Sequence, residues 1–205
     1  MNKEIRIFSS PEFRAYEDGD DKYIEGYALT YNNESKNLGG FVEIIDNNSI
    51  NENTDISDVM CLFNHKDEYI LARNTSKTLE IINDEKGLYY KAKLDMNITY
   101  HKDLYLSIQR GDINKSSFAF YLPQDGSGEK WEKIGDKYIR RITQFRIISD
   151  VSPVSNAAYQ NTTSMVRSFE EVKKELEEEI VAESKEEVKE NNVNEYMHKY
   201  ITLIK

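Results

Sequence analysis

Short segments rich in β-branched and aromatic residues recur along most of this chain, and they limit the folds that are open to it. Between residues 4 and 148 they read EIRIF, YIEGYALTY, FVEIID, DVMCLF, TLEII, LYYKAKL, SFAFYL and YIRRITQFRII. Several alternate apolar with polar residues, as strands with one buried face do. Turn-forming clusters such as Asn37–Gly40 and Asn83–Gly87 separate them. This succession predicts an α+β, mainly β fold whose body is an antiparallel, barrel-like sheet rather than a set of βαβ units.

One helix is expected within this body, from about Thr99 to Arg110. Leu104 and Ile108 would line one face, Thr99 could cap the start, and Gly111 is placed to end the helix. The body should therefore carry one or a few flanking helices.

The composition changes abruptly after Ser168. The last 37 residues contain 11 Glu, 6 Lys and no Asp. An apolar stripe at helical spacing runs along their first part: Phe169, Val172, Leu176 and Ile180. We therefore divide the chain into a body, residues 1–168, and an acidic C-terminal tail, residues 169–205, that is partly helical or disordered. The pattern fits both a solvated tail and a partner-binding or assembly helix.

Charge and cysteine content exclude several classes of protein. The net charge is −10 at pH 7 and no basic stripe is present, which argues against nucleic acid as a partner. The single cysteine, Cys61, allows no intramolecular disulfide and no cysteine-based zinc site. The three histidines are scattered and have no cysteine partners, which supports the expectation that no metal or cofactor is needed. No apolar segment approaches the ~18 residues of a membrane span, and the N-terminus has no apolar signal region. We expect a cytoplasmic protein that is neither secreted nor membrane-bound.

Three histidines are candidates for a general base: His65, His101 and His198. His198 falls in the acidic tail, and His101 falls on the predicted helix, at its edge with the body. His65 follows the strand-like DVMCLF run and precedes Lys66–Glu68, which is typical of a turn. A strand end of this kind joins a rigid scaffold to an accessible loop, which suits a general base, although structural histidines are also common there.

Two adjacent serines open the SFAFYL segment, and alternation separates them. Ser116 shares a strand face with Phe118 and Phe120, whereas Ser117 shares the other face with Ala119. If the phenylalanines face the core, Ser117 lies on the small-residue face that a substrate can approach. Ser117 is therefore the better nucleophile candidate; the alternative is a strand-start hydroxyl that bonds the backbone.

A serine nucleophile needs a base within hydrogen-bond reach and a third group that orients the base. Asp150, at the end of the last β-like segment, is the preferred third group, and Glu43 is the rival. The chain has 37 acidic residues, so the residues alone leave this choice open.

An ordered set of motifs covers about residues 24–167. In chain order they are Gly26–Ala28, Phe41–Ile45, Phe63–His65, Gly87-Leu88, Gly111–Ile113, Ser117–Phe120, Asp150–Ser152, Ala157–Tyr159 and Val166-Arg167. Together they resemble the bacteriophage HK97-type prohead maturation protease family, whose fold is related to that of the herpesvirus assembly proteases. The resemblance implies that His65 is the base, Ser117 the nucleophile and Asp150 the third catalytic residue.

The chain departs from the family pattern at several positions. Lys115, Ser116 and Ala119 stand where the family often has Gly, Met and Gly, and Ala157–Tyr159 replaces a Pro-Ala-Tyr element. Asp150 stands where many members carry Glu, which shortens the reach of the orienting carboxylate.

The resemblance implies a serine endopeptidase of capsid maturation that acts in the bacterial host cytoplasm, inside the assembling prohead. Its implied substrates and partners are the scaffolding protein or the scaffold-like segment of the major capsid protein, and itself through autocleavage. The herpesvirus relatives also imply a homodimer to test for, and an oxyanion contact from Arg140 or Arg141.

Two other functions remain open. The main alternative is a non-enzymatic capsid scaffolding or assembly protein with the same fold. A serine hydrolase with a small-molecule substrate is disfavoured, because the chain has no Gly-x-Ser-x-Gly motif.

Overall fold

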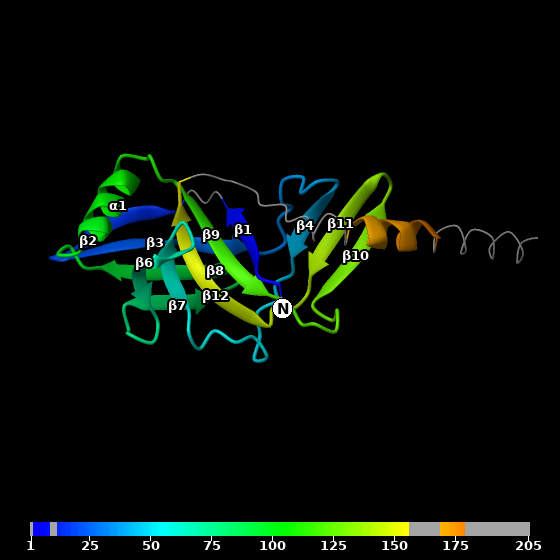
Figure 1. The fold of residues 1–205 in the computed structure, drawn as a ribbon, viewed down its shortest axis with the longest axis horizontal. Helices are drawn as coiled ribbons and strands as arrows, with labels where there is room; N and C mark the ends of the chain where they lie inside the picture. Colours follow the sequence, from blue (N-terminus) through cyan, green and yellow to red (C-terminus); the bar gives the residue numbers. More distant parts are fainter. Residues whose placement is uncertain (1, 9–11, 156–168, 179–205) are drawn as a thin grey trace, which may run out of the picture.

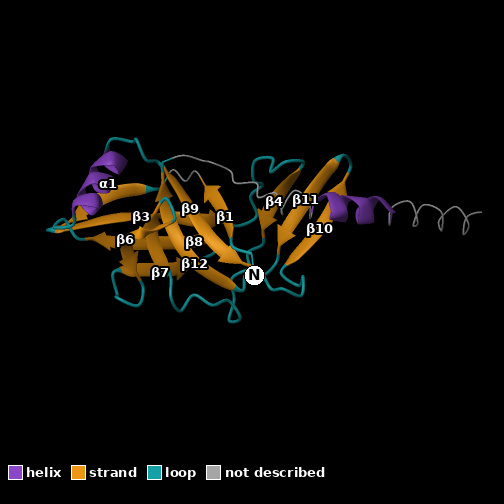
Figure 2. Cartoon of the chain, viewed as in Figure 1, coloured by secondary structure: helices purple, strands orange, loops and turns teal. Residues whose placement is uncertain are grey.

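The computed structural model describes residues 2–8, 12–155 and 169–178, and within these ranges the chain is mainly β-sheet (Figure 2). The named elements, in chain order, are β1 (Glu4–Phe8), β2 (Arg14–Asp18), β3 (Asp21–Thr30), β4 (Phe41–Ile45), β5 (Met60–Phe63), β6 (Lys66–Arg73), β7 (Leu79–Asn83), β8 (Gly87–Leu94), α1 (Thr99–Gln109), β9 (Lys115–Tyr121), β10 (Glu129–Ile134), β11 (Lys137–Ile142) and β12 (Ile147–Val154). Residues 169–178 form a further helix. Neither of these two described helices is long and apolar enough to cross a membrane.

The strands form three sheets in the part of the chain that the structure describes. Their orders are β1-β9-β12-β5-β6, β2-β3-β8-β7 and β10-β11-β4. The first two sheets and α1 make up a large lobe, and the third sheet forms a smaller lobe beside it (Figure 1).

The prediction of a mainly β fold is confirmed, but the antiparallel barrel-like arrangement is wrong. No described sheet closes on itself, and two of the strand pairs, β12 with β5 and β11 with β4, are parallel. The physical reason is that alternation shows only which face of a strand is buried. It does not identify the neighbouring strand or its direction.

The main core lies in the large lobe and combines side chains from both of its sheets. Phe118, Phe120 and Phe145 form its aromatic centre, where the Phe118 and Phe120 rings stack with centroids 5.0 Å apart and Phe145 meets Phe120 edge-on at 4.9 Å. All three side chains are fully buried, and each burial stabilises the fold by about 1.5–3 kcal/mol. This core fixes the strand that carries both predicted serines.

Helix α1 occupies almost the predicted range, with Leu104 and Ile108 on its buried face. The predicted cap is wrong, since Thr99 is already helical and Ile98 precedes the helix without a side-chain cap. Gly111 ends the helix as expected: its φ of +83° favours glycine, and its N–H donates to the carbonyl of Ile108.

The helix at residues 169–178 packs on the small lobe. Phe169 is only 3% exposed and lies in a cluster with Leu38, Phe41 and Tyr138. Gly40 permits this contact, because a Cβ there would lie 2.7 Å from the Phe169 ring. Ile180 and the rest of the acidic tail, like the motifs at 157–159 and 166–167, lie outside the described residues.

Candidate active site

Strand β9 carries both serines and separates them as alternation predicts. Ser116 faces the core, where its Oγ lies 3.1 Å from the Tyr90 hydroxyl. Ser117 points to the opposite face and is paired across the sheet with Ser152 of β12 and Ile7 of β1. Both serines are 0% exposed. The face that carries Ser117 is therefore covered in this structure, whereas an open face was expected.

His65 lies in the tight turn between β5 and β6. Phe63 pairs with Lys66, so only Asn64 and His65 make the turn, and both have positive φ, 56° and 57°. A two-residue hairpin turn of type I′ requires positive φ at both central positions, where Asn is favoured. His65 takes this left-handed conformation at a cost of roughly 1–2 kcal/mol. The turn comes earlier than expected, since the residues predicted as a turn, 66–68, begin β6.

This turn is attached to β12, the strand that carries Asp150. The Asn64 N–H donates to the carbonyl of Pro153 at 3.1 Å, and the Ser155 N–H donates to Asn64 Oδ1 at 3.0 Å. These two bonds hold the turn over the end of β12. A strained backbone conformation persists only where the surrounding structure holds it, and these two bonds hold the turn that contains His65.

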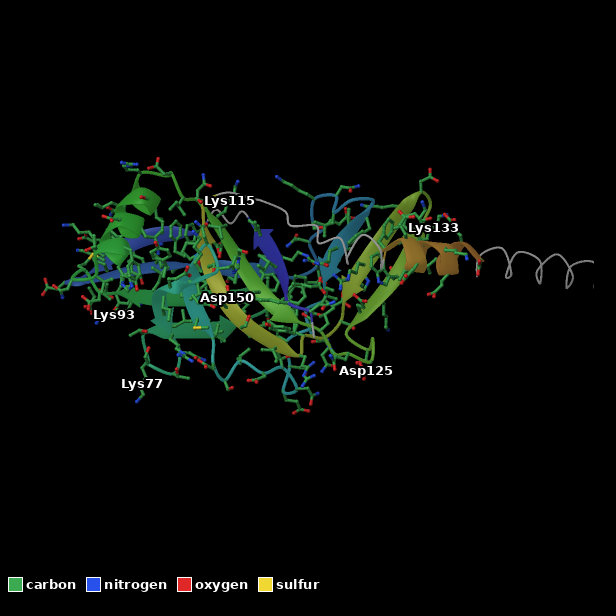
Figure 3. The ribbon with its side chains drawn as sticks, in the orientation of Figure 1. Lys77, Lys93, Lys115, Asp125, Lys133 and Asp150 are labelled. Atoms are coloured by element: carbon green, nitrogen blue, oxygen red, sulfur yellow. The ribbon has the colours of Figure 1, made fainter. Side chains whose placement is uncertain are left out.

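The structure brings the three predicted site residues together from distant parts of the chain. Asp150 Oδ1 lies 2.5 Å from His65 Nδ1, and His65 Nε2 lies 2.6 Å from Ser117 Oγ. Asp150 comes from β12, in the middle of the large lobe (Figure 3). The imidazole therefore bridges a carboxylate and a serine hydroxyl through its two nitrogens, which is the arrangement of an acid–base–nucleophile triad.

The Ser117 hydroxyl has a second acceptor within reach. The carbonyl oxygen of Arg6 on β1 lies 2.8 Å from Ser117 Oγ. A hydroxyl has one proton, so it donates either to His65 Nε2 or to this carbonyl. Only the first alternative prepares the serine for attack, and β1 therefore competes with the imidazole for the same proton.

Asp150 is an ionised partner despite its burial. Burial alone would raise the pKa of this carboxyl, which is only 1% exposed. The hydrogen bond to His65, the charge of that ring and the nearby Lys3 ammonium outweigh burial, so the pKa lies below its usual value. Lys3 Nζ lies 3.0 Å from Oδ2, the oxygen that faces away from His65.

Glu43, the alternative third residue, is hydrogen-bonded to two arginines, Arg6 and Arg140. It is 3% exposed and accepts two hydrogen bonds of 2.7 Å from the Arg6 guanidinium and one of 3.0 Å from Arg140. Arg140 also donates to Glu4 at 2.6 and 2.9 Å. Burial would raise the pKa of Glu4, but hydrogen bonds and charge from Arg140 and Arg6 lower it to about 2. These four residues form a buried ionic network, named here the Arg6–Glu43 network, between β1 of the large lobe and β4 and β11 of the small lobe.

The two arginines considered for an oxyanion contact are both held by carboxylates. Arg140 belongs to the Arg6–Glu43 network and also donates to Glu129 at 2.5 Å. Arg141 donates to Asp46 and to Glu132, each at 3.1 Å. Their donor groups are therefore engaged in stabilising the strands of the small lobe.

Two residues that contact Asp150 were not predicted from the sequence as site residues: Ser152 and Lys3. Ser152 lies against both Asp150 and His65, and its position two residues after Asp150 could have placed it on the same strand face. Lys3 gave no local signal, because its contact with Asp150 depends on the pairing of β1 with β9.

The other two histidines are placed differently. His101 is 4% exposed and structural: its Nδ1 accepts from the Asp95 N–H at 3.1 Å, and its Nε2 donates to the Ile70 carbonyl at 2.9 Å. A pocket beside it, between β6 and the start of α1, includes none of the three predicted site residues. His198 lies outside the described residues. Among the described residues, no group of three His, Cys, Asp or Glu side chains is arranged to hold a metal ion.

Comparison with known proteins identifies the family. Residues 9–175 match the family model of the caudovirus prohead serine protease. Searches of curated proteins and of solved structures found no match. The matched stretch contains β2 to β12 and all three residues that meet around the imidazole. Because the model covers most of its 205 residues, the chain belongs to the caudovirus prohead serine protease family.

Proposed function

We propose that this chain is the endopeptidase of capsid maturation, with Ser117 as nucleophile, His65 as general base and Asp150 as the residue that orients the base. The observation that carries this assignment is the line of two short contacts through one imidazole, 2.5 Å to Asp150 and 2.6 Å to Ser117. Family membership supports the class of reaction, and the geometry supports the roles.

The two contacts of the imidazole support one starting protonation state. His65 donates its Nδ1–H to the Asp150 carboxylate, so Nε2 keeps a lone pair that can accept the Ser117 hydroxyl proton. As Ser117 Oγ attacks the scissile carbonyl carbon, the proton moves to Nε2. Asp150 then stabilises the imidazolium that forms. When the tetrahedral intermediate collapses, the same proton passes to the leaving amine, and water later hydrolyses the acyl-enzyme by the same route.

The substrates proposed are scaffolding protein or the scaffold-like segment of the major capsid protein, together with the protease itself. Cleavage would take place inside the assembling prohead in the host cytoplasm. The complete burial of Ser117 supports a latent enzyme, because a peptide bond cannot reach Oγ until the covering segments move. A resting state of this kind suits a protease that is packaged together with its substrates.

A co-expression experiment tests the proposal. The chain is produced with the capsid protein of its phage, and mass spectrometry measures the masses of both proteins over time. We expect wild type to shorten the capsid protein and itself, and Ser117→Ala to abolish both cleavages.

Ser116→Ala is the matched control on the neighbouring residue. Ser116 faces Tyr90 and the core, so its loss should leave cleavage near the wild-type rate. Cleavage that survives Ser117→Ala would overturn the nucleophile assignment. If no cleavage occurs with any variant while proheads still assemble, the chain acts as a scaffolding protein of the same fold.

A further inference from the structure

Ser152 lies on the strand face that carries Ser117 and Asp150, beside the turn that carries His65. It lies two residues after Asp150 on β12 and pairs directly across the sheet with Ser117 of β9. The period of a strand places Asp150 and Ser152 on one face, and the cross-strand register places Ser117 beside them. Ser152 is 0% exposed, so its hydroxyl has to find its partners inside the protein.

The hydroxyl of Ser152 contacts both partners of the His65–Asp150 hydrogen bond. Its Oγ donates to Asp150 Oδ1 at 2.9 Å and lies 3.2 Å from His65 Nδ1. Together with the 2.5 Å contact between His65 and Asp150, these distances make a closed triangle of three polar atoms.

This triangle favours one tautomer of the imidazole. Ser152 donates its single hydroxyl proton to the Asp150 carboxylate, so its oxygen presents a lone pair to His65 Nδ1. That lone pair is favourable only when Nδ1 carries a proton, which it shares between Asp150 Oδ1 and Ser152 Oγ. In this tautomer Nε2 is unprotonated and free to take the proton of Ser117.

The hydroxyl also helps to fix the carboxylate. Oδ2 of Asp150 forms an ion pair with Lys3 at 3.0 Å, and Oδ1 accepts hydrogen bonds from Ser152 and His65. With contacts on both oxygens, the plane of the carboxylate cannot rotate without breaking at least one of them. Rotation would lengthen the contact to Nδ1 and release the ring.

We propose that Ser152 is a positioning residue for proteolysis, which holds the Asp150 carboxylate and selects the imidazole tautomer that accepts the Ser117 proton. The proposal rests on the proposed function of the triad. It assigns to Ser152 no contact with the substrate and no transfer of its own proton.

Three substitutions at residue 152 separate this role from simple packing. Ser152→Ala removes the hydroxyl, Ser152→Cys replaces it with a slightly larger thiol that is a weak donor, and Ser152→Thr keeps the hydroxyl on a residue that strands favour. Ser149→Ala is the control on the same strand, because Ser149 Oγ bonds the Ala119 carbonyl at 3.3 Å and none of the triad.

The first measurement is the time course of capsid-protein cleavage in the co-expression system. Loss of a hydrogen bond to a charged group predicts that Ser152→Ala and Ser152→Cys cleave about 10- to 100-fold more slowly. Ser152→Thr and Ser149→Ala should cleave at rates within about threefold of wild type, a change much smaller than the loss predicted for the other two variants. If the alanine variant does not fold, the cysteine variant gives the same comparison without leaving a cavity.

The second measurement is ¹⁵N NMR of the histidine rings in the free, full-length protein, which needs no substrate. Wild type and Ser152→Thr should show His65 protonated at Nδ1, whereas Ser152→Ala and Ser152→Cys should show a mixture of tautomers. A role in packing alone would leave the tautomer unchanged.

The outcomes distinguish the two proposals. Wild-type cleavage rates in Ser152→Ala or Ser152→Cys, or slow cleavage with an unchanged tautomer, would overturn the role of Ser152 and leave the triad in place. Cleavage that persists in Ser117→Ala would overturn the triad itself, and the role of Ser152 with it.

Discussion

Replacing Glu43 with glutamine tests whether this buried carboxylate serves the fold or the chemistry. Its two oxygens accept three hydrogen bonds of 2.7 to 3.0 Å from Arg6 and Arg140, both of which are almost fully buried. An amide of the same size keeps one acceptor but turns an N–H₂ group toward a guanidinium and removes the negative charge. Removal of one partner from a buried ion pair costs about 3–5 kcal/mol.

Such a loss should be visible in unfolding. For a domain of this size, about 3–5 kcal/mol lowers Tm on the order of 10 °C. Urea titration followed by the fluorescence of Trp131, the only tryptophan, measures the same loss of unfolding free energy. Trp131 reports on the small lobe, where its ring packs against Phe41 with centroids 4.8 Å apart.

Activity separates Glu43 from Asp150. At a temperature where each variant is folded, Glu43→Gln should cleave the capsid protein near the wild-type rate, while Asp150→Asn should lose several orders of magnitude. The reasoning fails if Glu43→Gln unfolds like wild type. It also fails if folded Glu43→Gln loses as much activity as Asp150→Asn, because Glu43 would then be the third catalytic residue.

Two further predictions concern the ionic network and the small lobe. The pKa of Glu4 is lowered from 4.5 to about 2, so its stabilising contribution is complete above about pH 4.5 and is lost as the pH falls through about 2. The free energy of unfolding should therefore fall by about 3 kcal/mol over this range, measured by urea titration at each pH, and Glu4→Gln should flatten this part of the profile. Phe169→Ala should undock the helix at residues 169–178, since it removes a ring whose centroid lies 5.7 Å from that of Trp131 and whose burial is worth about 3–5 kcal/mol. The emission of Trp131 should shift to longer wavelength, and an unchanged spectrum would show that this contact does not hold the helix in place.

The local parts of the site were predictable from the sequence. Alternation alone separated Ser116 from Ser117, and the structure places the first against Tyr90 and the second against His65. The sequence also predicted a strand end before His65, although the turn is made by Asn64 and His65 and so begins two residues before the predicted turn at Lys66–Glu68. These predictions depend on periods of two residues and on turn chemistry, which act over short distances.

The non-local parts were not predictable in this way. The choice between Asp150 and Glu43 depends on which strands lie beside the turn at His65, and each carboxylate sits in a strand with similar surroundings in the sequence. The strands β2, β6 and β10 were not predicted; they are rich in charged residues, so their pattern gave little β signal. The barrel-like prediction failed for a related reason, because parallel pairing joins segments such as β5 and β12 that lie far apart in the chain.

The order in which the strands are synthesised affects when this site can exist. Strand β12 is the last of the strands that the structure describes, yet it lies in the middle of its sheet, between β9 and β5. Until residues 147–154 have left the ribosome, no strand joins the pair β1-β9 to the pair β5-β6 in this sheet. Contacts over 85 residues, from His65 to Asp150, and over 111 residues, from Arg6 to Ser117, also place this sheet among slowly folding topologies of high contact order. A nascent chain therefore cannot align Ser117, His65 and Asp150 before residues 147–154 have emerged and β12 has been inserted between β9 and β5.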